Sequence, residues 1–191
     1  ELLRVERKVL LCVSLAVLQS DVEEEREFLV ILDLDVHQGD GTATILAKDD
    51  AILTVSVHCA ENFPFRKAQS DHDLAVAEGT QDEEYMVIVE SAIETAMDFQ
   101  PDILLFQAGV DGLKTDALGR LNLSRGALRD RNQAVFDATL SANIPCVLFM
   151  GGGYSNPISP TVDAFYDLFV AAASANQQRL RRQSTAARND L

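Results

Sequence analysis

The stretch "FLVILDLDVHQGDGTATIL", residues 28–46, is the most informative part of this chain. It opens with a short apolar run that is typical of a buried strand, and it then places Asp33, Asp35 and His37 two residues apart. Successive side chains of a strand point to opposite faces, so these three would lie in one row. Buried carboxylates this close repel one another unless something positive lies among them. The stretch therefore suggests a metal site, or else hydrogen-bonded turn and cap chemistry around the Gly-Asp-Gly that follows.

Three further apolar runs follow the first, each rich in Val, Ile, Leu and Phe and ended by Gly or polar residues. They are residues 51–58, 102–109 and 145–153, and the helix-like stretches between the runs are residues 41–49, 82–99 and 124–142. Upstream, residues 5–19 predict a largely buried helix and residues 21–27 an acidic connector. Strands that alternate with helices predict parallel pairing with right-handed crossovers. The pattern therefore predicts an α/β fold, with a mainly parallel sheet between helices in three αβα layers.

The composition excludes several classes of protein. The chain has 191 residues, 47% of them hydrophobic, which suffices for one globular domain with a sizeable core. A net charge of −14 and a pI near 4.5 argue against electrostatic binding to nucleic acid or to an anionic membrane surface. The apolar run at residues 9–18 is too short to span a bilayer, and Cys12, Cys59 and Cys146 show no paired spacing. We therefore expect an intracellular protein of the nucleus or cytoplasm, with an organelle as the alternative, and without a disulfide framework.

The last residues differ in pattern from the rest. Beyond about Ser174 the tail "ANQQRLRRQSTAARNDL" loses its apolar periodicity. Because such a segment has no apolar stripe to bury, we expect residues 174–191 to be a frayed or disordered tail, and residues 1–173 to form the folded part.

The polar residues that follow the predicted strands form a candidate site. In a parallel sheet, functional groups collect just beyond the carboxyl ends of the strands. Asp111 follows the run at 102–109, and together with Asp35 and His37 it would supply two carboxylates and one imidazole. An open set of three ligands is typical of catalytic metal sites, and this one suits zinc or iron(II), which ligand type alone does not separate. A metal held there would polarise a carbonyl and lower the pKa of a bound water.

Two more motifs follow predicted strands. "GGGY" lets the backbone approach the site closely, and Tyr154 would then donate a hydrogen bond to a developing oxyanion. The alternative is a glycine turn with an ordinary packed tyrosine. "ENFPF", residues 61–65, offers Phe63 and Phe65 either as walls of an apolar channel or as a lid over the core.

Four motifs, taken in order, are similar to those of one family. "DLDVHQGDGT", "TVSVHCAENFPF", "FQAGVDGLKTDALGRLNLS" and "MGGGY" resemble the zinc-dependent histone deacetylase family, and more closely its class IV, bacterial and plant members. The resemblance covers about residues 9–170. It implies the arginase/deacetylase fold, although the two-manganese motif of the arginases themselves is absent. It also implies that residues 1–173 are the C-terminal portion of such a domain, with the N-terminal part missing.

The resemblance implies a role for each matching residue. Asp35, His37 and Asp111 would be the zinc ligands, and Tyr154 would stabilise the tetrahedral intermediate together with zinc. Further matches concern a structural potassium site, with Asp33, Ser56 and Val57, and the acyl-lysine channel, with Phe63 and Gly152. The reaction implied is hydrolysis of N-acetyl-lysine, in a histone or another protein, by attack of an activated water.

The departure from the family lies in the general base. The family uses one of two adjacent histidines upstream of the ligand strand, whereas this chain has only His37, His58 and His72, and no such pair. Asp33 and Asp40 match the acids that orient the missing pair. We therefore expect this polypeptide by itself to have little deacetylase activity. Two alternatives stay open: a metal-binding or interaction module without catalysis, and a deacetylase of acetylpolyamines or other small acylated amines.

Overall fold

Five parallel strands form one sheet in the order β3-β2-β1-β4-β5. The computed structural model describes residues 27–189, and their side chains as far as residue 185. The strands are β1 Leu29–Asp33, β2 Ile52–Cys59, β3 His72–Val76, β4 Ile103–Gln107 and β5 Cys146–Phe149, and the helices are α2 Asp40–Leu46, α3 Asp82–Asp98, α4 Arg125–Ala142 and α5 Ser159–Asn189. The helix predicted at residues 5–19 and the acidic connector at 21–27 lie outside the described residues, apart from residue 27.

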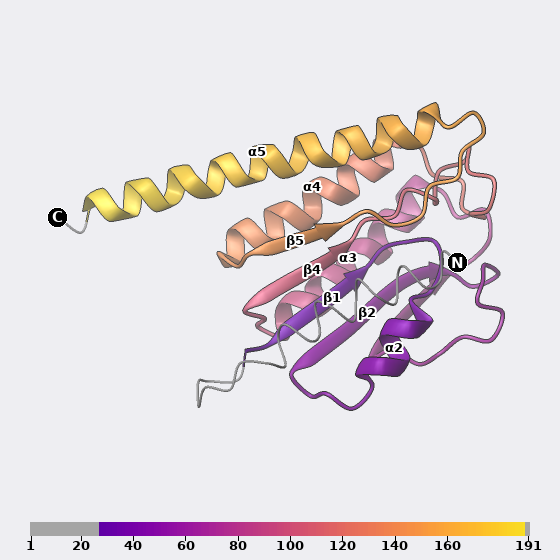
Figure 1. Cartoon of the computed structure of the whole chain (residues 1–191), viewed down its shortest axis with the longest axis horizontal. Helices are drawn as coiled ribbons and strands as arrows, with labels where there is room; N and C mark the ends of the chain where they lie inside the picture. Colours follow the sequence, from indigo (N-terminus) through magenta and orange to yellow (C-terminus); the bar gives the residue numbers. More distant parts are fainter. Residues whose placement is uncertain (1–26, 190–191) are drawn as a thin grey trace.

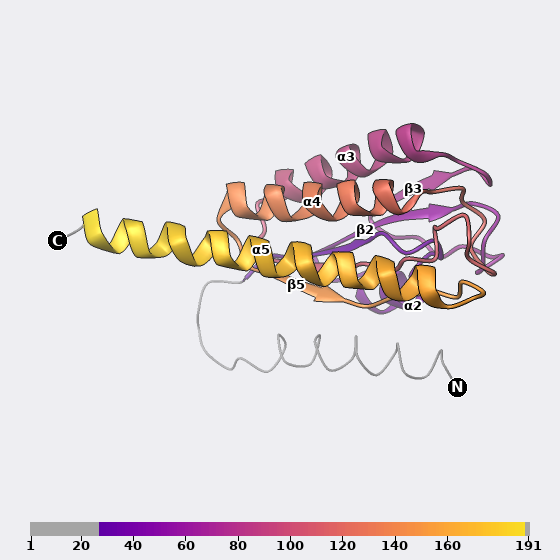
Figure 2. The ribbon, with the colours of Figure 1, turned by 90° about the horizontal axis from the view of Figure 1, so that it is seen from above.

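Helices lie on both faces of the sheet, as Figures 1 and 2 show. α3 and α4 lie side by side on one face, and α5 packs along α4. The larger core lies between the sheet and these helices, where the rings of Phe106 and Phe136 meet edge-on with centroids 6.1 Å apart. α2 lies on the opposite face, and its Leu46 joins a smaller cluster with Ile31 and Leu105. The predicted three-layer α/β fold is thus confirmed.

The helix predicted at residues 124–142 illustrates how local sequence sets an element. Ser124 precedes the first turn, and its hydroxyl accepts a hydrogen bond from the backbone N–H of Ala127 at 3.1 Å, a helix N-cap. At the other end Asn143 adopts a left-handed conformation, with φ of 57°, which terminates α4. These two residues account for the agreement between the predicted and observed ends of this helix.

β3 is an element that the sequence pattern did not predict. Its first residue, His72, lies opposite Val55 of β2. β3 lies at the edge of the sheet and its first residues are exposed, so it needs no apolar run of the kind that marked the other strands. The side chain of His72 is exposed.

α5 corrects the expectation of a disordered tail. The helix continues without interruption to Asn189, so residues 174–189 are helical, and its far end projects beyond the sheet (Figure 1). A helix of 31 residues is about 46 Å long. Ala, Gln and Arg dominate this part and are good helix formers, which need no apolar stripe when most of the helix faces solvent. The Arg182 guanidinium also donates to the carbonyl of Leu140 in α4 at 2.7 Å.

Among the described helices, none has the length and apolar character that crossing a bilayer requires. Cys59 is buried and Cys146 is half-buried, and both are free thiols.

Candidate metal centre

Asp35, His37 and Asp111 converge at the carboxyl edge of the sheet. Asp35 and His37 follow β1, and Asp111 follows β4, the neighbour of β1. The Nδ1 atom of His37 lies 2.9 Å from Oδ2 of Asp111 and 3.2 Å from Oδ1 of Asp35. One ligand atom from each residue lies within 4.8 Å of the other two. The structure therefore brings together the three residues that the sequence pattern had grouped.

The local backbone differs from the predicted row on one strand. β1 ends at Asp33, and the chain bends through residues 35–37. The backbone N–H groups of residues 35, 36 and 37 donate to carboxylate oxygens of Asp33, Asp111 and Asp35, at 3.1, 3.0 and 2.9 Å. Because side chains satisfy these donors, the ladder with the neighbouring strands need not continue. The same contacts hold Asp35 and Asp111 in place.

Two glycines make room for the carboxylates. A Cβ atom on Gly109 would lie 2.1 Å from Oδ2 of Asp35, and one on Gly152 would lie 1.9 Å from Oδ2 of Asp111. Both distances are far inside van der Waals contact, so these positions require glycine. The backbone N–H of Gly152 also donates to Oδ2 of Asp35 at 2.7 Å. Gly152, predicted for the substrate channel, thus adjoins the metal cluster itself.

Burial sets the charges of the cluster. Burial, helped by the negative charge of Asp35, raises the pKa of Asp111 to about 7. Burial alone would lower the pKa of His37, but hydrogen bonds to Asp111 and Asp35 and their negative charges together outweigh it and raise this pKa to about 10. Burial would likewise raise the pKa of Asp35, but hydrogen bonds from His37 and Gly152 lower it overall. At neutral pH His37 is therefore protonated in this structure. Its positive charge compensates the two carboxylates, as a bound metal cation would.

The donor set fits a divalent metal ion. Asp35 and Asp111 are 6% and 0% exposed, and carboxylates so buried require a partner of positive charge. The His37 side chain is 23% exposed, which leaves one side of the cluster open to solvent. Two carboxylates, one imidazole and an open side match a catalytic zinc or iron(II) site.

Arg131 is a residue of this site that the sequence analysis missed. Its side chain is fully buried in α4, and Nη1 donates to the backbone carbonyls of Gly109 at 2.7 Å and Leu34 at 3.2 Å. These carbonyls lie at the ends of β4 and β1, next to the residues that carry the ligands. The signal was present: Arg131 stands three residues after Leu128 and four before Val135, on the apolar face of the helix.

Of the predicted potassium-site residues, Asp33 adjoins the metal cluster, because its Oδ1 accepts from the backbone N–H of Asp35. Asp33 and Ser56 are register partners in β1 and β2, and both line a cavity of about 10 Å³, which is about one water-sized sphere. Val57 is the next residue of β2 and is buried, and the Ser56 hydroxyl lies 3.0 Å from Nδ1 of His58. Asp40 is half-buried in the first turn of α2 and is not a member of the Asp35–His37–Asp111 cluster.

Tyr154 and Phe63 lie near Gly152 and Asn62 in the chain, and these two residues contact the cluster. Tyr154 lies two residues after Gly152, is half-buried, and its backbone N–H donates to Oδ2 of Asp116 at 2.6 Å. Phe63 is 46% exposed and packs edge-on against Phe65, with ring centroids 6.1 Å apart. The loop that carries both rings reaches the cluster through Asn62, whose Nδ2 lies 3.3 Å from Nε2 of His37. The roles of Tyr154 in catalysis and of Phe63 in a channel stay predictions.

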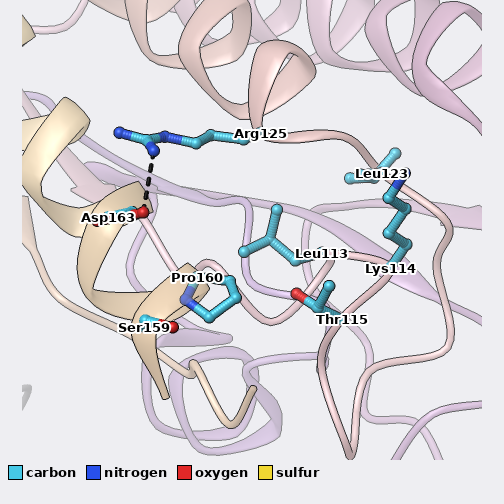
Figure 3. A pocket seen from close by; sticks show the side chains of 8 residues that line it. All are labelled: Leu113, Lys114, Thr115, Leu123, Arg125, Ser159, Pro160 and Asp163. Carbon is cyan, nitrogen blue, oxygen red and sulfur yellow. Dashed lines mark hydrogen bonds and ion pairs between the residues drawn. The ribbon is translucent and has the colours of Figure 1, made fainter. Parts of the chain in front are cut away.

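A larger pocket lies elsewhere on the molecule. Its volume is about 190 Å³, and Figure 3 shows its walls: Leu113, Lys114, Thr115, Leu123, Arg125, Ser159, Pro160 and Asp163. Arg125 reaches across to Asp163 at 3.1 Å. None of the three residues of the metal cluster lines this pocket, and its charges are of both signs, so we assign it no role.

The amino-acid sequence is similar to those of several known proteins. An uncharacterized protein of the cyanobacterium Picosynechococcus is 40% identical over 135 residues, which are 70% of this chain and 45% of that protein. Histone deacetylase 2 of Arabidopsis thaliana is 33% identical over 148 residues, or 75% of this chain and 37% of that protein. The chain thus spans less than half the length of these relatives.

Solved structures and a domain family match as well. The crystal structure of an acetylpolyamine aminohydrolase from Burkholderia pseudomallei superposes with a TM-score of 0.63 at 20% identity, covering 76% of this chain and 45% of that one, which shows a shared fold. The histone deacetylase domain family matches residues 11–167, which include every residue of the cluster. The chain therefore belongs to the histone deacetylase family and contains part of its domain.

Proposed function

We propose that this chain is the metal-binding portion of a zinc-dependent deacetylase that hydrolyses N-acetyl-lysine. One observation supports this most directly: Asp35, His37 and Asp111 converge in a buried, glycine-walled cluster with one open side. Membership of the histone deacetylase family makes amide hydrolysis the natural use of such a cluster. The assignment of zinc, the catalytic roles and the substrate are part of the proposal.

Each residue would have a defined part in the reaction. Zinc, when bound by the three ligands, would polarise the acetyl carbonyl and acidify a water molecule. Tyr154 would donate a hydrogen bond to the oxygen of that carbonyl as it gains charge, and Phe63 would pack against the methylene groups of the lysine side chain. The water oxygen would add to the carbonyl carbon, the C–N bond would break to leave acetate, and a proton of that water would pass to the leaving amine.

The proton donor and acceptor for these steps would come from outside this chain. The sequence has three histidines and no adjacent pair. Loss of a general base costs a factor of about a hundred to ten thousand in rate. We therefore propose that the 191-residue chain has little activity by itself, and readily measured deacetylation of an acetyl-lysine peptide by the purified chain would contradict this.

A structural potassium ion is a further part of the proposal. Ser56 and the backbone carbonyls of Asp33, Asp35, His37 and Val57 would hold it beside the segment that carries the proposed zinc ligands. The small cavity that Asp33 and Ser56 line supports this assignment, since it is of the size of one water molecule or ion.

Metal binding by the purified chain is the first test. We expect one zinc ion per chain after dialysis against zinc, measured by elemental analysis, and loss of that zinc in Asp111→Ala. Asp137→Ala is the matched control, because Asp137 is an exposed carboxylate of α4. A wild-type chain without zinc, or zinc retained by Asp111→Ala, would refute the proposed centre.

A second candidate function is a metal-binding or interaction module without catalysis, which the absence of a histidine pair favours. The substrate also has an alternative, an acetylpolyamine or another small acylated amine. Rates on acetyl-lysine peptides and on acetylpolyamines, measured with a longer form of the protein that supplies the histidine pair, would separate the three possibilities. No turnover of either substrate class by that form would favour the non-catalytic module.

A further inference from the structure

Asn62 contacts the one ring nitrogen of His37 that does not face the carboxylates. Nδ1 of His37 faces Asp35 and Asp111, and Nδ2 of Asn62 lies 3.3 Å from Nε2 on the other side of the ring. Asn62 is only 3% exposed, although it lies on a connecting loop after β2. A buried amide at this position limits how the imidazole can rotate.

A second loop holds the Asn62 side chain in turn. Oδ1 of Asn62 accepts from the backbone N–H of Arg120 at 2.9 Å, and Nδ2 donates to the backbone carbonyl of Leu118 at 2.8 Å. Because one end of the amide meets a backbone donor and the other a backbone acceptor, its orientation is determined. The backbone carbonyl of Asn62 accepts from Nζ of Lys67 at 2.5 Å, so its main chain is tied down as well.

Asp116 connects the same loop to Tyr154. Its Oδ1 accepts from the backbone N–H groups of Leu118 and Gly119, at 2.8 and 2.9 Å. Its Oδ2 accepts from the backbone N–H of Tyr154 at 2.6 Å. Hydrogen bonds therefore connect Asn62 with residues 118–120 and, through Asp116, with Tyr154, while Asn62 itself contacts the His37 ring.

We propose that Asn62 is a positioning residue. It holds the His37 ring in the orientation for metal binding, and through residues 118–120 it fixes the position of this ring relative to Tyr154. The inference rests on the proposed metal centre. Asn62 touches no reacting atom in this role. It acts by limiting the orientation of a ligand. Loss of such a partner typically lowers metal affinity by about 10- to 100-fold.

The test compares metal binding by wild type, Asn62→Ala and Asn122→Ala. Asn122 is the matched control, because it is an exposed asparagine whose side chain lies outside the hydrogen-bond series. Zinc affinity is measured by competition with a chelating dye, and the visible absorption of bound Co²⁺ reports the geometry of the ligands. We expect Asn62→Ala to bind zinc about 10- to 100-fold more weakly and to shift the Co²⁺ bands, with Asn122→Ala unchanged in both.

Zinc affinity of Asn62→Ala within twofold of wild type, with the same Co²⁺ bands, would overturn the inference. If Asn62→Ala does not fold, the isosteric Asn62→Asp decides, because it replaces the NH₂ group that faces His37 by an oxygen. Shifted Co²⁺ bands in that variant support the role, and bands identical to wild type overturn it. Failure of the wild-type chain to bind metal would instead refute the metal centre, so the two failures are distinguishable.

Discussion

Replacement of Arg131 by methionine tests how the strand ends are held. The guanidinium is fully buried and donates to the carbonyls of Leu34 and Gly109 and to Oδ1 of Asn132. Its charge also lies 5.6 Å from the centre of the Phe106 ring. Methionine keeps most of the apolar volume in this position but removes every donor.

The expected magnitude follows from these contacts. Three buried acceptors lose a donor, and each such loss costs about 1–3 kcal/mol. The variant also avoids the desolvation of a buried guanidinium, which offsets several kcal/mol of this cost. We therefore expect Arg131→Met to lower the free energy of unfolding by about 2–4 kcal/mol, a large part of the stability of a single domain.

Urea unfolding followed by circular dichroism measures this change. Arg129→Met is the matched control, because its side chain is 61% exposed on the same helix and lies 3.8 Å from Asp167. A surface pair of this kind contributes about 0–1 kcal/mol. The reasoning is wrong if the two variants lose equal stability, or if Arg131→Met loses less than about 1 kcal/mol.

Three further predictions concern the metal centre. Gly152→Ala should weaken zinc binding at least about tenfold, because the new Cβ would lie 1.9 Å from Oδ2 of Asp111 and must displace it. Competition with a chelating dye measures the zinc affinity. An unchanged affinity would contradict this prediction and show that the cluster relaxes around the new methyl group. Zinc affinity should rise with pH, because His37 and Asp111, with pKa values of about 10 and 7, must lose their protons to bind the ion. Zinc titrations at fixed pH values from 6 to 8.5 should therefore show release of about two protons per bound zinc ion below pH 7 and about one above it. A zinc affinity that does not change with pH would contradict the assigned ligands. In a longer, active form of the protein, Tyr154→Phe should lower kcat about a hundred- to a thousandfold at unchanged zinc content, and a wild-type kcat would exclude Tyr154 from the reaction.

The strongly apolar parts of the fold were predictable because their pattern is local. β1, β2, β4 and β5 are short apolar runs, and α3 and α4 carry helical periodicity with turn and cap residues at their ends. β3 escaped prediction because it lies at the edge of the sheet, with its first residues exposed. The end of α5 was not predicted as a helix, because its helical structure comes from intrinsic propensity and not from an apolar stripe.

The sequence by itself predicted which three residues make up the candidate site. Asp35, His37 and Asp111 each follow a predicted parallel strand, and the carboxyl ends of such strands meet at one edge. Only the tertiary structure revealed Arg131, Asn62 and the loop that Asp116 holds. The contacts that connect Arg131, Asn62 and Asp116 with Leu34, Gly109, His37 and Tyr154 span 22 to 97 residues of the chain. A hydrogen bond between residues so far apart depends on how the whole chain packs, and no local pattern records it.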